Sequence, residues 1–359
     1  MRRYWFWVAV LFLAISSSVR ADNVSFSTFV SSVAINAVEG GNNSTIAFNY
    51  NGTSFVGSVY FDNQLYSTNL NGGGVATFGT PLGTGTSAGV QSSNLVGEVV
   101  VGASLGQAGF AVGDIYAGSQ ANTNIFRYSA NGSSQSLFAT LPAAAGNVRQ
   151  IFFDPGSSFG GNMVVTTTSG NIYKVTSAGA VSLLASVGED TEGMAIASSA
   201  FGPYAGDLLV SSEGSGTLRL VSPGGVITVV GSVGKFPSAE TVSVVPLDLN
   251  ASNPLEGFYV ANYPFNVQFA GASNFTSLLG DAVVTAETLG STMWDVSYNG
   301  TGFTVTPFTF TGNSINQFED GIFVTPTLIS ETTPEPSSLL LLGSGLLGLG
   351  LKAKRKFCS

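Results

Sequence analysis

The densest group of acidic residues in the sequence is the segment GEDTEG, in which Glu189, Asp190 and Glu192 fall within four positions. Carboxylates spaced this closely are typical ligands of Ca²⁺, which prefers six to eight oxygen atoms. Glu240, in the segment SAETV, is a fourth candidate. No Asp-x-Asp-x-Asp-Gly loop accompanies these residues, so a solvated loop between strands is the favoured interpretation and a Ca²⁺ site is the alternative. The sequence therefore predicts no cofactor; if Ca²⁺ binds, Glu189, Asp190, Glu192 and Glu240 are its candidate ligands.

Most residue types that carry out catalysis are missing from the chain. There is no His, and the single Cys is Cys358, next to the last residue. A Ser-His-Asp triad, a thiolate nucleophile, a disulfide and a Cys/His zinc site are therefore excluded from the body of the protein. Paired carboxylates can hydrolyse glycosides, but among 21 acidic residues their presence alone is no evidence for that chemistry. We predict no catalytic residue.

Charge is unevenly distributed along the chain. All 21 acidic residues lie between Asp22 and Glu335, and only five of the 12 basic residues fall in the same span. The remaining basic residues lie at the two ends. A surface this acidic repels a phosphate backbone, so nucleic acid is excluded as a partner.

The N-terminal sequence MRRYWFWVAVLFLAISSSVRA has the three parts of a secretory signal peptide. Two arginines precede an apolar run from Tyr4 to Ile15, and small residues follow it. The apolar run is too short to span a bilayer, which argues against the alternative of an uncleaved anchor. We predict a signal peptide over residues 1–21 that is cleaved after Ala21.

A second apolar segment, from Ser337 to Leu351, lies close to the C-terminus. As a helix it would be about 22 Å long, which is shorter than the roughly 30 Å hydrocarbon core of a bilayer. The basic cluster that follows would hold its end on the cytoplasmic side; it consists of Lys352, Lys354, Arg355 and Lys356. The segment therefore predicts a transient inner-membrane anchor.

Residues 332–359 resemble the PEP-CTERM protein-sorting signal of Gram-negative bacteria. The resemblance rests on Pro334-Glu335-Pro336, the apolar helix and the basic cluster, in that order, and the terminal Phe-Cys-Ser is a small departure. It implies recognition by an exosortase-type membrane protease that cuts near the Pro-Glu-Pro motif. It also implies a protein of the cell surface, the extracellular space or a biofilm, in an organism that makes exopolysaccharide.

The body of the chain, residues 22–331, contains an internal repeat. Segments that open with Gly and lead into a short apolar run begin at residues 57, 113, 161, 206 and 257, and three of them are followed by similar stretches: NIFRYSANG, NIYKVTSAG and GTLRLVSPG. A period of about 50 residues with Gly turns is typical of a β-propeller with one repeat per blade. We predict an all-β fold of six blades, with a β-sandwich or a β-solenoid as the alternative.

Finer features of the propeller also follow from the repeat. The Gly-initiated strands 113–119, 161–167 and 206–212 are predicted to lie nearest the channel, each paired with the next strand as a hairpin. Residues 265–302 do not follow the repeat of about 50 residues. The segment GIFVTP (321–326) is predicted to be a final strand that pairs with strands in residues 24–58 and closes the ring.

The segment TEGMAIASSAFGPYAGDLLVSS (191–212) resembles the repeats of NHL and gluconolactonase-like six-bladed propellers, and SAETVSVVP (238–246) and NVRQIFFDP (147–155) are partial copies. In the lactonase relatives, Glu, Asn and Asp side chains hold a metal at one end of the channel. Glu192 and Glu240 occupy equivalent repeat positions, but Arg149-Gln150 stands in the third copy. The resemblance therefore implies no complete ligand set.

Together these observations favour an exported surface or extracellular-matrix protein whose propeller is a non-catalytic interaction scaffold. Exopolysaccharide or other surface proteins are its predicted partners. The alternative is a propeller hydrolase or lactonase that depends on a divalent metal. Three or more carboxylates that converge within about 5 Å at one channel mouth would favour the hydrolase.

Overall fold

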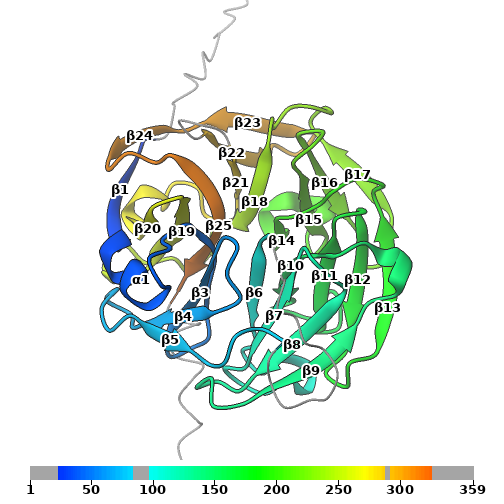
Figure 1. The fold of residues 1–359 in the computed structure, drawn as a ribbon. Coiled ribbons are helices and arrows are strands. Elements are labelled where there is room, and N and C mark those ends of the chain that lie inside the picture. The colour runs from blue at the N-terminus through cyan, green and yellow to red at the C-terminus, as the bar shows by residue number, and fades with distance from the viewer. Residues whose placement is uncertain (1–22, 84–96, 288–291, 326–359) are drawn as a thin grey trace, which may run out of the picture.

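The computed structural model describes residues 23–83, 97–287 and 292–325, whose strands form six sheets around a central channel. Figure 1 shows the ring of blades face on. The predicted six-bladed, all-β propeller is confirmed. The predicted signal peptide, Pro334-Glu335-Pro336 and the basic cluster from Lys352 to Lys356 lie outside the described residues.

Blades 1 to 4 are each built from four consecutive antiparallel strands, and in each blade the chain runs from the channel outward. Blade 1 contains β2 (Thr45–Tyr50), β3 (Phe55–Val59), β4 (Leu65–Thr68) and β5 (Ala76–Phe78). Blade 2 contains β6 (Val99–Ala103), β7 (Ile115–Ser119), β8 (Asn124–Tyr128) and β9 (Gln135–Thr140). Blade 3 contains β10 (Val148–Phe153), β11 (Met163–Thr167), β12 (Asn171–Val175) and β13 (Val181–Ser186). Blade 4 contains β14 (Met194–Ile196), β15 (Leu208–Ser212), β16 (Thr217–Val221) and β17 (Ile227–Val230).

Blades 5 and 6 are interleaved in sequence, which explains the break in the repeat. Blade 5 contains β18 (Ala239–Val244), β21 (Ala282–Ala286), β22 (Thr292–Tyr298) and β23 (Phe303–Pro307). Blade 6 contains β25 (Gln317–Val324), β19 (Gly257–Tyr263), β20 (Asn266–Gly271), β1 (Asn23–Val30) and β24 (Thr309–Gly312). The chain thus leaves blade 5 after β18, forms the β19–β20 hairpin of blade 6, and then returns.

Ring closure takes place within blade 6, because this sheet holds strands from both ends of the described chain. β25 confirms the final strand that was predicted around residues 321–326. The predicted direct pairing of this strand with residues 24–58 is wrong, since β25 pairs with β19, and β1 pairs with β20 and β24. β1 closes the ring from the outer part of the sheet.

Each boundary between neighbouring blades is filled by one of six clusters of buried apolar residues. Alternate side chains of one strand enter different clusters: in β7, Ile115 and Ala117 face blade 1, and Tyr116 faces blade 3. Side chains alternate between the two faces of a sheet, and in this ring both faces of each blade are covered by neighbouring blades. The second strand of a blade is therefore a continuous run of apolar residues in the sequence.

The prediction that the Gly-initiated strands lie nearest the channel is wrong. The predicted strands are 113–119, 161–167 and 206–212, and they correspond to β7, β11 and β15, which are second in their blades. The channel is lined instead by β6, β10 and β14. The second strands repeat clearly because both of their faces are buried and must be apolar. The innermost strands also face the channel, so their sequences vary more.

The repeated glycine between the third and fourth strands has a conformational cause. Gly132, Gly179 and Gly225 have φ of 72°, 79° and 82°, and each amide donates to the carbonyl three residues earlier. A positive φ costs glycine little, so it ends these tight turns.

Helical structure in the described residues is limited to short segments between strands. α1 (Ser32–Val38) follows β1, and the side chain of Ser31 caps its N-terminus by accepting from the amide of Ala34. Four 3₁₀ helices complete the connections: η1 (Gln107–Gly109), η2 (Ala143–Ala145), η3 (Ser199–Tyr204) and η4 (Ala272–Asn274). Among the described residues, none of these helices has the length and apolarity needed to cross a membrane.

Closure by β1 can be tested with Phe26, which is buried and packs against the rings of Phe310 and Phe318. Phe26→Ala should destabilise the propeller by about 3–5 kcal/mol, because it leaves a cavity in the closing blade. Phe61→Ala is the matched control, since Phe61 is 58% exposed, and it should change stability by less than about 0.5 kcal/mol. Urea unfolding followed by circular dichroism measures both. Equal effects of the two substitutions would contradict the closure.

Candidate functional site

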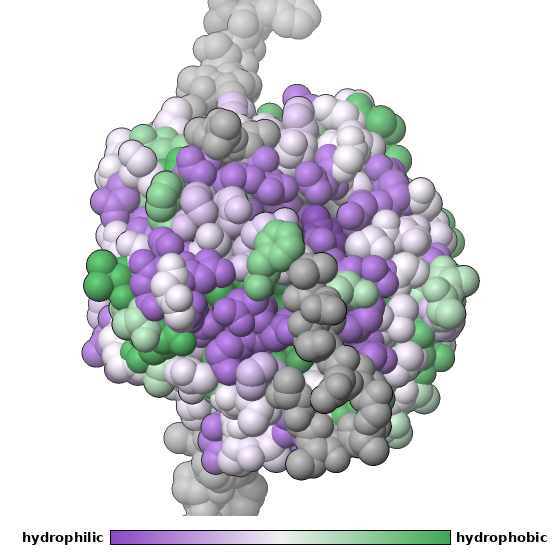
Figure 2. Space-filling view, viewed as in Figure 1, coloured by the Kyte–Doolittle hydropathy of each residue, from purple (hydrophilic) through white to green (hydrophobic). Residues whose placement is uncertain are grey.

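One end of the central channel carries a cluster of charged side chains around Arg149. The innermost strands of successive blades bring it together, because the early residues of each strand line this end and the later residues line the other. Glu98 precedes β6, Glu192 precedes β14, and Arg149, Glu240 and Glu319 lie near the starts of β10, β18 and β25. In Figure 2, hydrophilic residues surround the centre of the propeller face that is shown.

β-Bulges help to direct these side chains. The pairing of β10 with β11 shifts between Val148 and Gln150, so Arg149 is an extra residue in its strand. The pairing of β18 shifts between Ala239 and Val242, around Glu240. The pairing of β25 with β19 also shifts, between Phe318 and Gly321. A bulge re-aims a side chain that would otherwise point between blades, so three strands present charged residues at the same channel end.

Close approach of two blades brings Glu192 and Glu240 near each other. The amide of Gly193 donates to the carbonyl of Glu240 at 3.0 Å. A Cβ at position 193 would lie 2.3 Å from the backbone nitrogen of Val242 and 2.6 Å from that carbonyl oxygen. Only glycine fits at this position, so Gly193 sets the spacing of the two glutamates.

Arg149 is the positive centre of the site, with a side chain that is 5% exposed. Its Nη1 pairs with Glu98, and its Nη2 pairs with Glu192 and lies 3.3 Å from Oε2 of Glu213. Its Nε lies 3.3 Å from Oδ1 of Asp190. A buried guanidinium is tolerated when carboxylates surround it in this way.

Acidic groups outnumber this guanidinium. Seven carboxyl groups of the described residues interact with Arg149, directly or through space. These are Glu98, Asp190, Glu192, Glu213, Glu240, Glu287 and Glu319, and we call them the carboxylate cluster. One positive charge cannot neutralise seven negative ones, so the cluster must also hold protons or bind a further cation.

Burial and mutual repulsion raise the pKa values of the cluster. Burial, followed by repulsion from Glu240, raises the pKa of Glu98 to about 9. Burial raises the pKa of Glu240 to about 8, although Arg149 opposes the shift. Burial and repulsion from Glu240 raise the pKa of Glu287 to about 7, and the same two causes place the pKa of Glu319 well above its usual range.

Three members of the cluster are arranged as metal ligands. Glu192, Glu213 and Glu240 each place a carboxylate oxygen within 4.8 Å of the others. Oε2 of Glu192 and Oε2 of Glu240 are buried and have no hydrogen-bond partner among the described residues. Buried oxygens without donors are costly unless they are protonated or bind a cation. The residues present therefore fit a divalent metal ion.

Two of the four candidate ligands from the sequence, Glu192 and Glu240, belong to this trio. Asp190 lies beside Arg149, and Glu189 instead accepts from Arg219 and from the hydroxyl of Ser215. Sequence reasoning missed Glu98, Glu213 and Glu287. Glu213 and Glu287 directly follow β15 and β21, second strands of their blades, and no pattern near them indicates a channel position.

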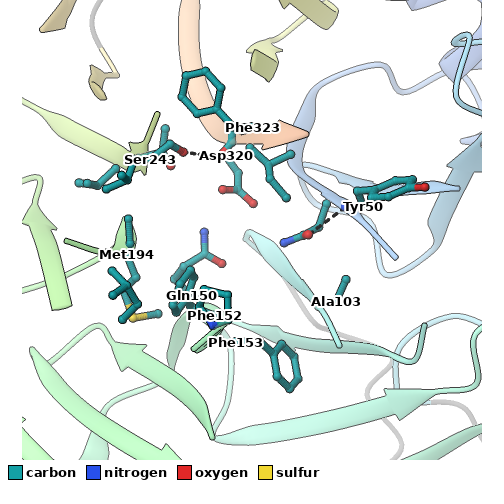
Figure 3. Close-up of a pocket in the computed structure, with 18 of the residues that line it drawn as sticks. Tyr50, Ala103, Gln150, Phe152, Phe153, Met194, Ser243, Asp320 and Phe323 are labelled. Atoms are coloured by element: carbon teal, nitrogen blue, oxygen red, sulfur yellow. Dashed lines mark hydrogen bonds between the residues drawn. The ribbon is translucent and has the colours of Figure 1, made fainter. Parts of the chain in front are cut away.

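The other end of the channel is an apolar cavity of about 310 Å³, which we call the channel cavity. Figure 3 shows Asp320 and Gln150 directed into it from opposite sides, with Met194 and Phe152 nearby. A narrow space of about 10 Å³, enough for about one water molecule, lies between the cavity and the carboxylate cluster. The protein therefore has two chemically different channel ends.

Comparison with known proteins supports the prediction for the tail and the fold. The family model of the PEP-CTERM protein-sorting motif matches residues 332–356. A motif of this type marks an exported protein that is held transiently in the membrane and processed by an exosortase. No curated protein matches the chain significantly.

Several solved structures resemble the described fold. A protein of unknown function from Bacteroides thetaiotaomicron is 9% identical, with a TM-score of 0.51, and the match covers 82% of this chain and 69% of that one. Virginiamycin B lyase from Staphylococcus aureus, a catalytically inactive variant with quinupristin, is 12% identical, with a TM-score of 0.47 and coverage of 75% and 71%. A protein described as a gluconolactonase candidate is 11% identical, with a TM-score of 0.47 and coverage of 82% and 90%. At these identities the likeness concerns the fold alone.

The role of Arg149 predicts a pH-dependent stability. The raised pKa values mean that the folded protein keeps protons which the unfolded chain releases above pH 4.5. In EDTA, stability should therefore fall as the pH rises from about 4.5 to about 9. Arg149→Met should steepen this fall and cost about 3–5 kcal/mol at neutral pH, because it leaves buried carboxylates without a counter-charge.

Lys235→Met is the control, because Lys235 is an exposed basic residue that lies outside the carboxylate cluster. Its cost should not exceed about 0.5 kcal/mol at any pH. Chemical unfolding between pH 5 and pH 9 measures both substitutions. A flat profile for Arg149→Met, or equal costs for the two variants, would contradict the assigned role of Arg149.

Proposed function

We propose that this protein is an exported surface or extracellular-matrix protein whose propeller is a non-catalytic scaffold that binds Ca²⁺ at the carboxylate cluster. The sorting motif in its tail, which an exosortase would process, supports export to the cell surface. The observation that carries the calcium site is the convergence of Glu192, Glu213 and Glu240 within 4.8 Å. Exopolysaccharide and other surface proteins are the proposed partners.

The ligand atoms favour calcium over transition metals. The three carboxylates supply oxygen only, and the chain has no His and no Cys before residue 358. Oxygen ligands suit Ca²⁺, whereas zinc sites usually contain nitrogen or sulfur. Two positive charges would also reduce the repulsion that raises the pKa values of the cluster.

A scaffold role is supported by the way the acidic groups are already engaged. Glu98, Glu192 and Glu213 pair with Arg149, so they are held in place rather than available as a base. Asp190 and Glu213 have side chains that are 36% and 35% exposed, so the trio borders solvent. Ca²⁺ takes six to eight oxygens, and hydroxyl groups of a glycan can complete its coordination from that side.

A metal-dependent hydrolase or lactonase is the second candidate, and the same convergence favours it. A divalent cation held by three carboxylates can polarise a substrate carbonyl. The carboxylates themselves would position the cation, and the exposed side of the trio would admit the substrate. Activity against lactones therefore distinguishes the two functions.

The calcium site predicts a stabilisation that depends on named carboxylates. Calcium at about 100 times its Kd should raise Tm by roughly 5 °C, and EDTA should reverse the rise. Glu240→Gln should weaken binding by about tenfold or more, because it removes one ligand charge. Isothermal titration calorimetry and thermal unfolding measure both effects.

Asp207→Asn is the control, because Asp207 lies outside the residues that line either channel end. It should leave calcium affinity unchanged. The absence of any calcium-dependent rise in Tm would refute the site. Lactone hydrolysis that requires calcium and disappears in Glu240→Gln would replace the scaffold by the hydrolase.

The sorting motif predicts a defined mature C-terminus. Mass spectrometry of the exported protein should find an end near Pro336, with the apolar segment and Lys352–Lys356 removed. Replacement of Pro334, Glu335 and Pro336 by Ala should leave the tail intact and keep the protein in the membrane fraction. A mature wild-type chain that still ends beyond Phe357 would exclude processing.

A further inference from the structure

The channel cavity has the form of a small-molecule site that is separate from the carboxylate cluster. Its volume of about 310 Å³ lies in the range of ligand-binding pockets. Leu105 and Pro246 are half-buried and Pro155 is exposed, so these lining residues form a rim at the solvent side. A ligand can therefore enter from the face opposite the cluster.

The walls of the cavity are built by alternate residues of the innermost strands. Phe152 lies two positions after Gln150 in β10, and Ile322 lies two positions after Asp320 in β25. Ile196 of β14 lines the same wall. Side chains two positions apart share one face of a strand, so each polar residue at the floor is followed by an apolar residue nearer the rim. The cavity is thus polar at its deep end and hydrocarbon-like above it.

Asp320 gives the deep end its charge. Among the described residues that line the cavity, it is the only acidic or basic one. It accepts from the amides of Phe48 and Gly321 and from the side chain of Gln150, and burial raises its pKa to about 7. Figure 3 shows its carboxyl group directed into the open space. Glu240, which lies beyond the narrow space, also raises the pKa of Asp320.

We propose that the channel cavity binds a small amphiphile with a primary ammonium head, which pairs with Asp320, and a short hydrocarbon body, which lies against Phe152, Ile196 and Ile322. An ammonium group supplies the positive charge that the floor lacks, and charge-assisted hydrogen bonds in a buried site are strong. The apolar walls remove the hydrocarbon body from water. The proposal does not depend on calcium binding at the other channel end.

The same features select against other head groups. A carboxylate head would meet the carboxylate of Asp320, which would repel it. A hydroxyl head can hydrogen-bond to Asp320 but adds no charge attraction. Affinity should therefore follow the charge of the head group when the hydrocarbon body is kept the same.

Hexylamine, hexanol and hexanoate provide this series, because they share one hydrocarbon chain. Isothermal titration calorimetry on the exported protein at neutral pH should show hexylamine binding at one site, at least about tenfold more tightly than hexanoate, with hexanol between them. Asp320→Asn should weaken hexylamine by about tenfold and leave hexanol nearly unchanged. Asp207→Asn, which changes charge outside the cavity, should alter neither.

Ile196→Trp fills the cavity without changing its charge and should weaken all three compounds together. Circular dichroism confirms that each variant retains the fold. Two results with the wild-type protein alone would overturn the proposal: equal affinities for the three compounds, or no binding of hexylamine. Hexylamine affinity that survives both Asp320→Asn and Ile196→Trp would place binding elsewhere and overturn it as well.

Discussion

The structure depends on one constraint: both faces of every blade must be buried against its neighbours. Six apolar clusters meet this requirement, one at each boundary, and the ring has to close for the last boundary to exist. Closure places six innermost strands around one channel, so that equivalent positions of these strands reach the same level. Residues that are about 50 positions apart in sequence, such as Glu192 and Glu240, are thereby brought together at one mouth. The chemistry of the channel is a consequence of the packing of the blades.

The carboxylate cluster shows how that packing concentrates charge. Each acidic residue is ordinary in its own segment of the chain, yet the seven share one buried guanidinium. Such a set is stable only if some of its carboxyl groups retain protons or if it binds a cation. The raised pKa values correspond to retained protons. Calcium would be the bound cation. Protons and calcium should therefore compete for the same oxygens, and exchange of one for the other changes the charge of the channel mouth without a change of fold.

Much of the fold could be predicted from the sequence, but only part of the site. The apolar second strands repeat because both faces are buried, and this indicated the propeller. The interleaving of blades 5 and 6 could not be predicted, because the β19–β20 hairpin looks like any other local hairpin. Glu192 and Glu240 were found as equivalent repeat positions, whereas Glu98 and Glu213 were not. The cluster as a whole is assembled by bulges at Arg149, Glu240 and Glu319, by the close approach at Gly193 and by contacts between blades, and none of these leaves a local sequence pattern.

The central claim is that Glu192, Glu213 and Glu240 hold a divalent cation at the channel mouth. Crystals of the propeller soaked in terbium, a luminescent and strongly scattering substitute for calcium, would locate the ion directly by anomalous diffraction. We predict one strong anomalous peak in contact with oxygens of these three glutamates, and its loss when calcium is added in excess. A crystal without a peak between these side chains, or with bound ions only at other acidic residues, would contradict the account.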